Sequence, residues 1–272
     1  LLAKCFGKKT YFTGGIDSLD SDYASAFNYK IQALFFKLCY WVADSCIIVS
    51  QSDLKNIFKV SSLKKKLSYS EHVINTKLFI ADVPKEKIFT SIVWMGDEGN
   101  VVRKGVDKAL QIFAELKKIP EFVDYRFVII GRKGEGEVLV RSIIDKYNLK
   151  GSVELKGEVS EEDKINLLKQ SKYYFQLSLY EGFGLAALEA LCANNIIIHS
   201  GKGGLANPIY KEQLLFDIDN DFDSELLKLV NKLACFTPIT SYDNLLEYYD
   251  IQRRKDDFEA IIVNGKSNYK LK

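Results

Sequence analysis

The stretch that decides the fold is Tyr180-Glu181-Gly182-Phe183-Gly184-Leu185-Ala186-Ala187-Leu188-Glu189-Ala190. It follows Lys172 to Leu179, a short aromatic segment that is typical of a strand. It leads into Leu185 to Ala193, which consists almost wholly of the strong helix formers Leu and Ala. The sequence therefore predicts a strand, a glycine turn and a helix that is apolar on all sides and buried.

The residues of this turn suit a phosphorylated ligand that carries hydroxyl groups. Gly182 and Gly184 let the backbone approach a ligand closely, and free N–H groups at a helix N-terminus favour an anion. Glu181 lies on the same rim. Glu189 lies within the apolar helix, and because a buried carboxylate without a partner is costly, we expect a hydrogen-bond donor beside it. The alternative is a capped core helix with one stray glutamate.

Glu181, seven intervening residues and Glu189, with Gly-Phe-Gly after the first glutamate, resemble the signature of the retaining GT-B glycosyltransferases of family 4, the glycosyl transferases group 1. Enzymes of this family use nucleotide-sugar donors. The resemblance covers about residues 8–264 and is strongest from 91 to 204. It implies an α/β fold of GT-B type, with a complete C-terminal Rossmann-like domain and an abbreviated N-terminal Rossmann-like domain.

The chain is accordingly expected to contain three parts. Residues 1–85 form a partial N-terminal domain on the acceptor side, residues 86–245 form the nucleotide-sugar-binding domain, and residues 246–272 form a helix that crosses back to the N-terminal part. The family's N-terminal domain is considerably longer, so the helix predicted at Ala24–Val42 should expose apolar surface. A partner, a second copy or upstream sequence would cover that surface.

Hydrophobic periodicity predicts alternating strands and helices in residues 86–245. The strands are expected at Ser91–Met95, Arg126–Ile130, Ser152–Leu155, Tyr173–Leu177 and Ile196–His199. The helices are expected at Lys104–Lys118, Gly136–Tyr147, Ser160–Gln170 and Gly184–Ala193. This order implies a parallel sheet with right-handed crossovers, and ligands bind beyond the carboxyl ends of the strands of such sheets. In residues 1–85, strands are expected at Lys9–Phe12 and Ser45–Val49, and Ser52-Asp53 caps a short helix.

The resemblance also implies a set of donor-binding residues. These are Arg103, Lys104, Gly131, Val159, Glu181, Gly182, Phe183, Gly184 and Glu189. Glu181 would accept hydrogen bonds from the sugar hydroxyls, and Lys104 would neutralise the leaving diphosphate, so these two are the implied catalytic residues. Glu181 is not assigned as a nucleophile.

The other residues of this set would hold the rest of the donor. The backbone of Gly182 to Gly184 would hold the sugar and diphosphate, and Glu189 would hold the ribose. The Gly131 loop would lie beside the nucleoside, and the backbone of Val159 would read the base. In this loop an ordinary strand-to-helix turn explains the glycines equally well.

Two features depart from the family. Asp97 follows Gly96 where the family usually has an arginine, so either Arg103 substitutes for it or the diphosphate site is weakened. The family's histidine near the sugar has no clear counterpart, since His72 lies in the expected linker and His199 on a core strand. A non-catalytic sugar-nucleotide-binding or partner module derived from a glycosyltransferase therefore stays open. A nucleotide-dependent oxidoreductase is disfavoured because the sequence contains no dinucleotide fingerprint.

Composition narrows the remaining alternatives. The 272 residues carry a formal net charge of +2, which does not favour nucleic acid as a partner. Five scattered cysteines read as reduced residues of a cytoplasmic protein. The resemblance implies no metal or other cofactor; the partners would be a nucleotide sugar and a glycan, lipid or small-molecule acceptor. The run Lys64-Lys65-Lys66 is either a solvated loop or a peripheral contact with the inner face of the membrane.

Overall fold

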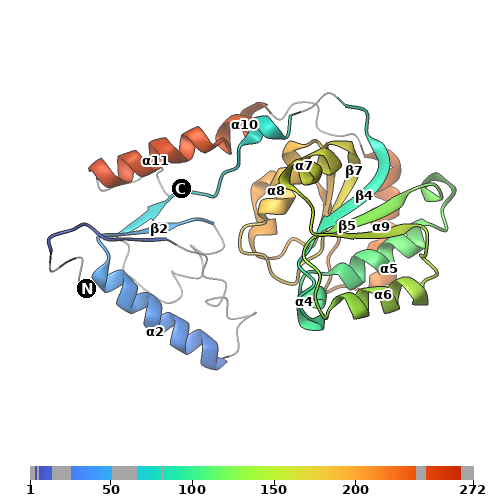
Figure 1. Cartoon of the computed structure of the whole chain (residues 1–272), viewed down its shortest axis with the longest axis horizontal. Coiled ribbons are helices and arrows are strands. Elements are labelled where there is room, and N and C mark those ends of the chain that lie inside the picture. Colours follow the sequence, from blue (N-terminus) through green and yellow to red (C-terminus); the bar gives the residue numbers. More distant parts are fainter. Residues whose placement is uncertain are drawn as a thin grey trace. The chain divides into compact units, whose positions relative to one another are not determined.

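The computed structural model describes residues 4, 6–13, 26–50, 66–80, 83–236 and 243–264. These residues form two compact units, which Figure 1 shows within the whole chain. Unit 1 consists of Leu1–Ile74, Glu181–Phe183 and Glu247–Lys272. Unit 2 consists of Asn75–Tyr180 and Gly184–Leu246.

Unit 2 is built on a six-stranded sheet in which every pair of neighbours is parallel. Its strands are β4 (Glu86–Ile92), β5 (Arg126–Ile130), β6 (Val153–Gly157), β7 (Ser171–Gln176), β8 (Ile196–His199) and β9 (Leu214–Leu215). The order β6-β5-β4-β7-β8-β9 shows that the chain runs outward from β4 to one edge and then returns to β7 to build the other edge. The strand order therefore switches direction between β4 and β7.

Helices cover both faces of this sheet. They are α4 (Glu98–Arg103), α5 (Val106–Leu116), α6 (Glu137–Lys146), α7 (Glu161–Gln170), α8 (Leu185–Cys192) and α9 (Phe222–Cys235). Short 3-10 turns occur at Thr76–Leu78, Pro120–Phe122, Gly203–Ala206 and Pro208–Tyr210. The alternation expected from the hydrophobic pattern of residues 86–245 is thus observed.

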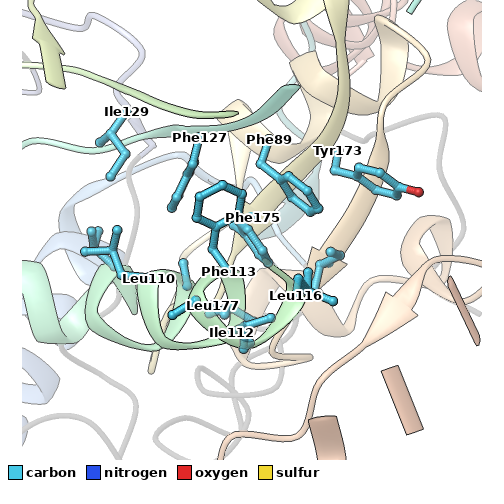
Figure 2. Close-up of a cluster of buried hydrophobic side chains, with 14 of the residues drawn as sticks. Phe89, Leu110, Ile112, Phe113, Leu116, Phe127, Ile129, Tyr173, Phe175 and Leu177 are labelled. Atoms are coloured by element: carbon cyan, nitrogen blue, oxygen red, sulfur yellow. The ribbon is translucent and has the colours of Figure 1, made fainter. Parts of the chain in front are cut away.

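The main core of unit 2 lies between the sheet and α5, as Figure 2 shows. The Phe89 ring stacks on Tyr173 and Phe175, with ring centroids 4.6 and 5.1 Å apart, and Phe113 of α5 packs edge-on against it at 5.5 Å. On the opposite face, a smaller cluster forms around Ile88, which precedes Phe89 on β4, and includes Leu167 of α7. Successive residues of a strand point to opposite faces, so β4 is buried on both sides.

Some element boundaries differ from those expected. The strand expected at Ser91–Met95 is β4, which begins earlier, at Glu86. The helix expected at Lys104–Lys118 begins at Val106, because Gly105 adopts a left-handed conformation with φ +69° and separates it from the unexpected helix α4. Hydrophobic periodicity does not detect such a break, since both helices carry apolar residues.

Unit 1 contains a parallel sheet of β1 (Tyr11–Thr13), β2 (Ser45–Ile48) and β3 (Leu67–Tyr69), in that order. Phe36 and Tyr40 of α2 (Ala26–Val42) pack against Ile48 of β2. The other face of α2 is apolar and 47–70% exposed, as expected for this helix; it carries Ile31, Leu34, Phe35, Leu38 and Trp41.

The C-terminal segment forms two helices, α10 (Asp243–Tyr248) and α11 (Ile251–Asn264), instead of one. The break coincides with Tyr249, whose carbonyl accepts the N–H of Ile74 at 3.0 Å. Further along, Asp257 of α11 accepts the Ser70 hydroxyl at 3.0 Å.

Two expectations fall on parts that the structure does not describe, or describes only in part. The helix capped by Ser52-Asp53 lies outside the described residues, as do Lys64 and Lys65. Lys66 is not simply solvated, because its ammonium donates to the carbonyl of Ala43, at the end of α2, at 2.9 Å. Of the helices in the described part of the chain, none combines the length and the apolar character that a membrane span requires.

Candidate functional site

The loops that follow β4 and β7 meet where the strand order of the sheet switches direction. The N–H of Leu179 donates to the carbonyl of Arg103 at 2.8 Å. A Cβ on Gly105 would lie 2.0 Å from the carbonyl oxygen of Leu177, so this close approach requires glycine. Ligands of parallel α/β sheets bind in the crevice at such a switch point.

Arg103 and Lys104 lie at the junction between α4 and α5. Arg103 is the last residue of α4, and its guanidinium donates to the Asn100 side chain at 2.6 Å. Lys104 is the C-terminal cap of α4 and does not open a helix, which corrects the position expected from the sequence. Asp97 caps the N-terminus of α4, where its carboxylate accepts the N–H of Asn100 at 2.6 Å. The aspartate that stands in place of the family's arginine thus has a role in local structure.

The glycine-rich loop after β5 packs against the loop after β4. Gly131 adopts φ +131°, and its N–H donates to the carbonyl of Gly157 at 2.8 Å. Added Cβ atoms on Gly134 and Gly136 would lie 2.5 and 2.4 Å from backbone carbonyl oxygens of Met95 and Asp97. The glycines of this loop therefore allow backbone to pack on backbone at the carboxyl edge of the sheet.

Val159 follows β6, and its side chain packs against the cluster around Ile88 and Leu167. Since that side chain is used in packing, recognition of a base at this position falls to the backbone of Val159.

The turn before α8 has the conformation that its glycines suggest. Gly184 adopts φ +88°, and its carbonyl accepts the N–H of Leu188 at 2.9 Å and the Tyr210 hydroxyl at 3.3 Å. The side chains of Ala187, Leu188, Ala190 and Leu191 are fully buried. The prediction of a buried apolar helix after the turn is confirmed.

Glu181, Gly182 and Phe183 group with unit 1. Phe183 is buried, and its ring packs against His72 and Tyr249, with centroids 5.4 and 6.2 Å apart. Because the side chain of Phe183 is packed in this way, its contribution to a ligand site falls to its backbone. Glu181 and Gly182 are partly exposed next to it.

His72 therefore has a neighbour that sequence reasoning did not find. Its Nδ1 lies 2.8 Å from a guanidinium nitrogen of Arg254 in α11. Burial, together with the Arg254 charge, lowers the pKa of His72 to about 4, so the ring is neutral at physiological pH and Nδ1 accepts the guanidinium proton. No local pattern links residues this far apart.

Glu189 has the donor that its burial demands. The ammonium of Lys164, in α7, lies 3.0 Å from Oε1 and 2.9 Å from Oε2 of Glu189. The side chains of both residues are 16% exposed. Burial raises the pKa of the Glu189 carboxyl, and the Lys164 charge opposes that shift. The expectation of a partner is confirmed, although the sequence did not identify Lys164.

His199 is a core residue, as expected from its strand. It ends β8, is 5% exposed, and packs against the Tyr210 ring with centroids 5.6 Å apart. Burial lowers the pKa of His199 to about 4, which keeps the ring neutral. Among the residues that the structure describes, no group of three or more His, Cys, Asp or Glu side chains could hold a metal ion.

A hollow of about 400 Å³ lies elsewhere, at the amino end of β6. Its lining residues include Arg141, Asp145 and Val153 and none of the residues expected to bind the donor. It is therefore separate from the site at the carboxyl edge of the sheet.

Comparison with known proteins places these loops in a family. The family model for glycosyl transferases group 1 matches residues 99–234, half of the 272-residue chain. The chain is 32% identical over 163 residues to a GDP-mannose:cellobiosyl-diphosphopolyprenol alpha-mannosyltransferase of Xanthomonas oryzae, covering 52% of the chain and 40% of that protein. It is 30% identical over 105 residues to one of the subunits of the human phosphatidylinositol N-acetylglucosaminyltransferase, covering 39% and 21%. The chain thus spans less than half the length of either relative.

Solved structures resemble nearly the whole chain. Sucrose-phosphate synthase from Thermosynechococcus elongatus superposes with a TM-score of 0.77 at 20% identity, covering 97% of this chain and 69% of the synthase. This likeness concerns the fold. The expected GT-B fold, with a complete C-terminal and an abbreviated N-terminal Rossmann-like domain, is confirmed.

Proposed function

The chain belongs to the glycosyl transferases group 1 family, and we propose that it moves a sugar from a nucleoside diphosphate donor to an acceptor with retention of the anomeric configuration. The observation that carries this proposal is the meeting of the loops after β4 and β7 at the switch point of the sheet. Arg103 and Lys104 lie in one of these loops, and the other loop leads to Glu181 and the N-terminus of α8.

In the proposed reaction the protein acts through charge and position. Lys104, with Arg103 beside it, neutralises the diphosphate as negative charge develops on the leaving group. Glu181 accepts hydrogen bonds from two sugar hydroxyls near the reacting carbon, and Glu189 does the same for the ribose hydroxyls. Backbone N–H groups of the turn from Gly182 to Gly184 hold the sugar and diphosphate.

The remaining donor contacts are proposed for the loops after β5 and β6. Gly131 lies where a nucleoside would pass close to the backbone, and Val159 offers its backbone to the base. Neither role depends on a side chain, which fits the left-handed conformation of Gly131 and the packed side chain of Val159. We propose that no metal or other cofactor takes part, because cationic side chains and backbone N–H groups compensate the diphosphate charge.

The acceptor is proposed to be a glycan, a lipid or a small molecule. The Xanthomonas relative's name specifies a lipid-linked saccharide as acceptor and GDP-mannose as donor, and the human relative is named as one subunit of its enzyme. A partner protein or a second copy on the apolar face of α2 would agree with the second of these. We place the proposed activity in the cytoplasm or at the inner face of the membrane.

A non-catalytic sugar-nucleotide-binding module is the second candidate function. The observation that favours it is Asp97, a carboxylate that caps α4 at the place where the family usually has an arginine. A carboxylate near the diphosphate would oppose binding of its negative charge. Such a module would bind the donor without turning it over.

The deciding experiment measures binding first and transfer second. In a thermal-shift panel of UDP, GDP and ADP sugars, a ligand present at about 100 times its Kd should add about 2.7 kcal/mol of stability to the folded protein. The sugar nucleotide that binds is then used as donor with acceptors of each class, and the anomeric configuration of the product is read by NMR. Binding without donor hydrolysis or transfer would favour the second candidate, and an inverted product would refute retention.

A further inference from the structure

We propose that Lys164 is a positioning residue for the donor, which orients the Glu189 carboxylate and keeps it ionised for the ribose hydroxyls. This inference rests on the proposed function, in which Glu189 binds the ribose. It concerns a residue of α7 that is not itself expected to touch the donor. Both residues of the pair lie within unit 2.

The geometry of the pair defines the direction of the carboxylate. One ammonium lies within hydrogen-bond distance of both carboxylate oxygens, at 3.0 and 2.9 Å, so rotation of the carboxylate would break at least one contact. A carboxylate offers about four lone-pair positions, and the ammonium occupies two of them. The other two remain for two neighbouring hydroxyl groups.

The ammonium is itself held from several sides. The Glu161 carboxylate lies 2.8 Å from Nζ of Lys164, and the Phe79 ring centroid lies 6.0 Å away. Two carboxylates and one ammonium leave this group with a net charge of −1. That charge makes the Glu189 oxygens strong acceptors for neutral hydroxyl donors.

Removal of the ammonium would change the protonation of Glu189. The ionisable groups that face the Glu189 carboxyl are Lys164 and Glu161 from α7 and Cys192 from its own helix. Burial and the Glu161 charge both raise the pKa of Glu189, and Lys164 alone among these groups lowers it. Without Lys164 the carboxyl would therefore bind a proton at a higher pH, and a protonated carboxyl accepts less well from two hydroxyls.

A purely structural pair that joins α7 to α8 is the alternative. Loss of such a pair would lower the melting temperature, but it would leave unchanged the preference for a ribose over a deoxyribose. The test therefore measures a ratio of affinities for two ligands that differ in one hydroxyl group.

The experiment uses isothermal titration calorimetry on the full chain. The ligands are the nucleoside diphosphate that binds best among UDP, GDP and ADP, and its 2′-deoxy and 3′-deoxy analogues, at pH 7.5 and at pH 5.5. The variants are Lys164→Met, Lys164→Arg, Glu189→Gln and the double variant Lys164→Met/Glu189→Gln. Lys169→Met, five residues further along α7, is the matched control.

Lys164→Met should reduce the preference for ribose about tenfold at pH 5.5, with a smaller loss at pH 7.5, as expected when a charged hydrogen bond is weakened. Lys164→Arg should retain most of the preference, and Lys169→Met should match the wild type. The double variant should bind like Glu189→Gln alone, because Lys164 acts through Glu189. If Lys164→Met fails to fold, Lys164→Arg and Lys164→Gln at the same two pH values provide the comparison.

An unchanged ribose preference in Lys164→Met or Lys164→Gln, with binding by the wild type intact, would overturn this inference alone. Additive losses in the double variant would also overturn it. Failure of the wild type to bind any of the three nucleoside diphosphates would overturn the proposed function and this inference together.

Discussion

Replacement of Gly105 by alanine should strongly destabilise unit 2, because Gly105 holds the junction of α4 and α5 against the end of β7. Its backbone adopts φ +69°, a conformation that costs a residue with a Cβ about 1–2 kcal/mol. The added Cβ would also lie 2.0 Å from the carbonyl oxygen and 2.5 Å from the carbonyl carbon of Leu177. Both are backbone atoms, so no side-chain rotation relieves the overlap.

The two effects together should reduce the free energy of unfolding by about 2–5 kcal/mol, when overpacking of about 1–3 kcal/mol is added to the backbone strain. For a domain of this size, the melting temperature should fall by about 4–20 °C. Urea denaturation, followed by circular dichroism, measures the free energy, and calorimetry measures the melting temperature.

Gly151 supplies the control for backbone strain. It adopts φ +85°, but an added Cβ would meet no atom within 4 Å. Gly151→Ala should therefore cost the strain alone, about 1–2 kcal/mol. Equal losses for the two variants would refute the reasoning, because they would show that the Leu177 backbone moves away freely.

Four further outcomes are expected. Lys104→Ala should weaken a nucleoside diphosphate about 10- to 150-fold and the free nucleoside far less, by calorimetry; equal losses would exclude contact with the diphosphate. Glu181→Gln should spare the bare nucleotide and weaken the sugar nucleotide and turnover, whereas the reverse would mean that Glu181 and Glu189 have exchanged roles. Transfer should survive EDTA, and a loss restored by a divalent ion would contradict the metal-independent proposal. His199 has a pKa of about 4 when folded, so between pH 6.5 and 4 the unfolded chain binds a proton that the folded chain does not. Stability should fall by about 3 kcal/mol as the pH decreases through this range, and urea titrations of His199→Leu should lack that component.

Much of the central unit could be predicted because its signals are local. The strands Arg126–Ile130 and Ile196–His199 have the bounds expected from their apolar runs. The turn at Gly184 was predictable because glycine tolerates a positive φ, which marks the start of α8. A helix rich in Leu and Ala is buried wherever it packs, so burial of α8 followed from composition.

The helix α4 shows where local signals fail. Asp97 was noted as the residue that replaces an arginine, but its use as an N-terminal cap was not predicted. The segment that it opens is short and is followed at once by α5, so hydrophobic periodicity merged the two helices. Their separation depends on the contact between Gly105 and the Leu177 backbone, and these two residues are far apart in the sequence.

The sequence by itself determined the parallel α/β sheet, the loops at the carboxyl ends of its strands and the demand for a donor beside Glu189, because periodicity, glycine conformation and the cost of a buried charge are properties of single residues and their near neighbours. The tertiary structure alone decided that Lys164 meets that demand and that His72 packs against Phe183. Such pairs form where strand order and helix packing bring distant segments together, and the side chains at either end carry no signal of their partner.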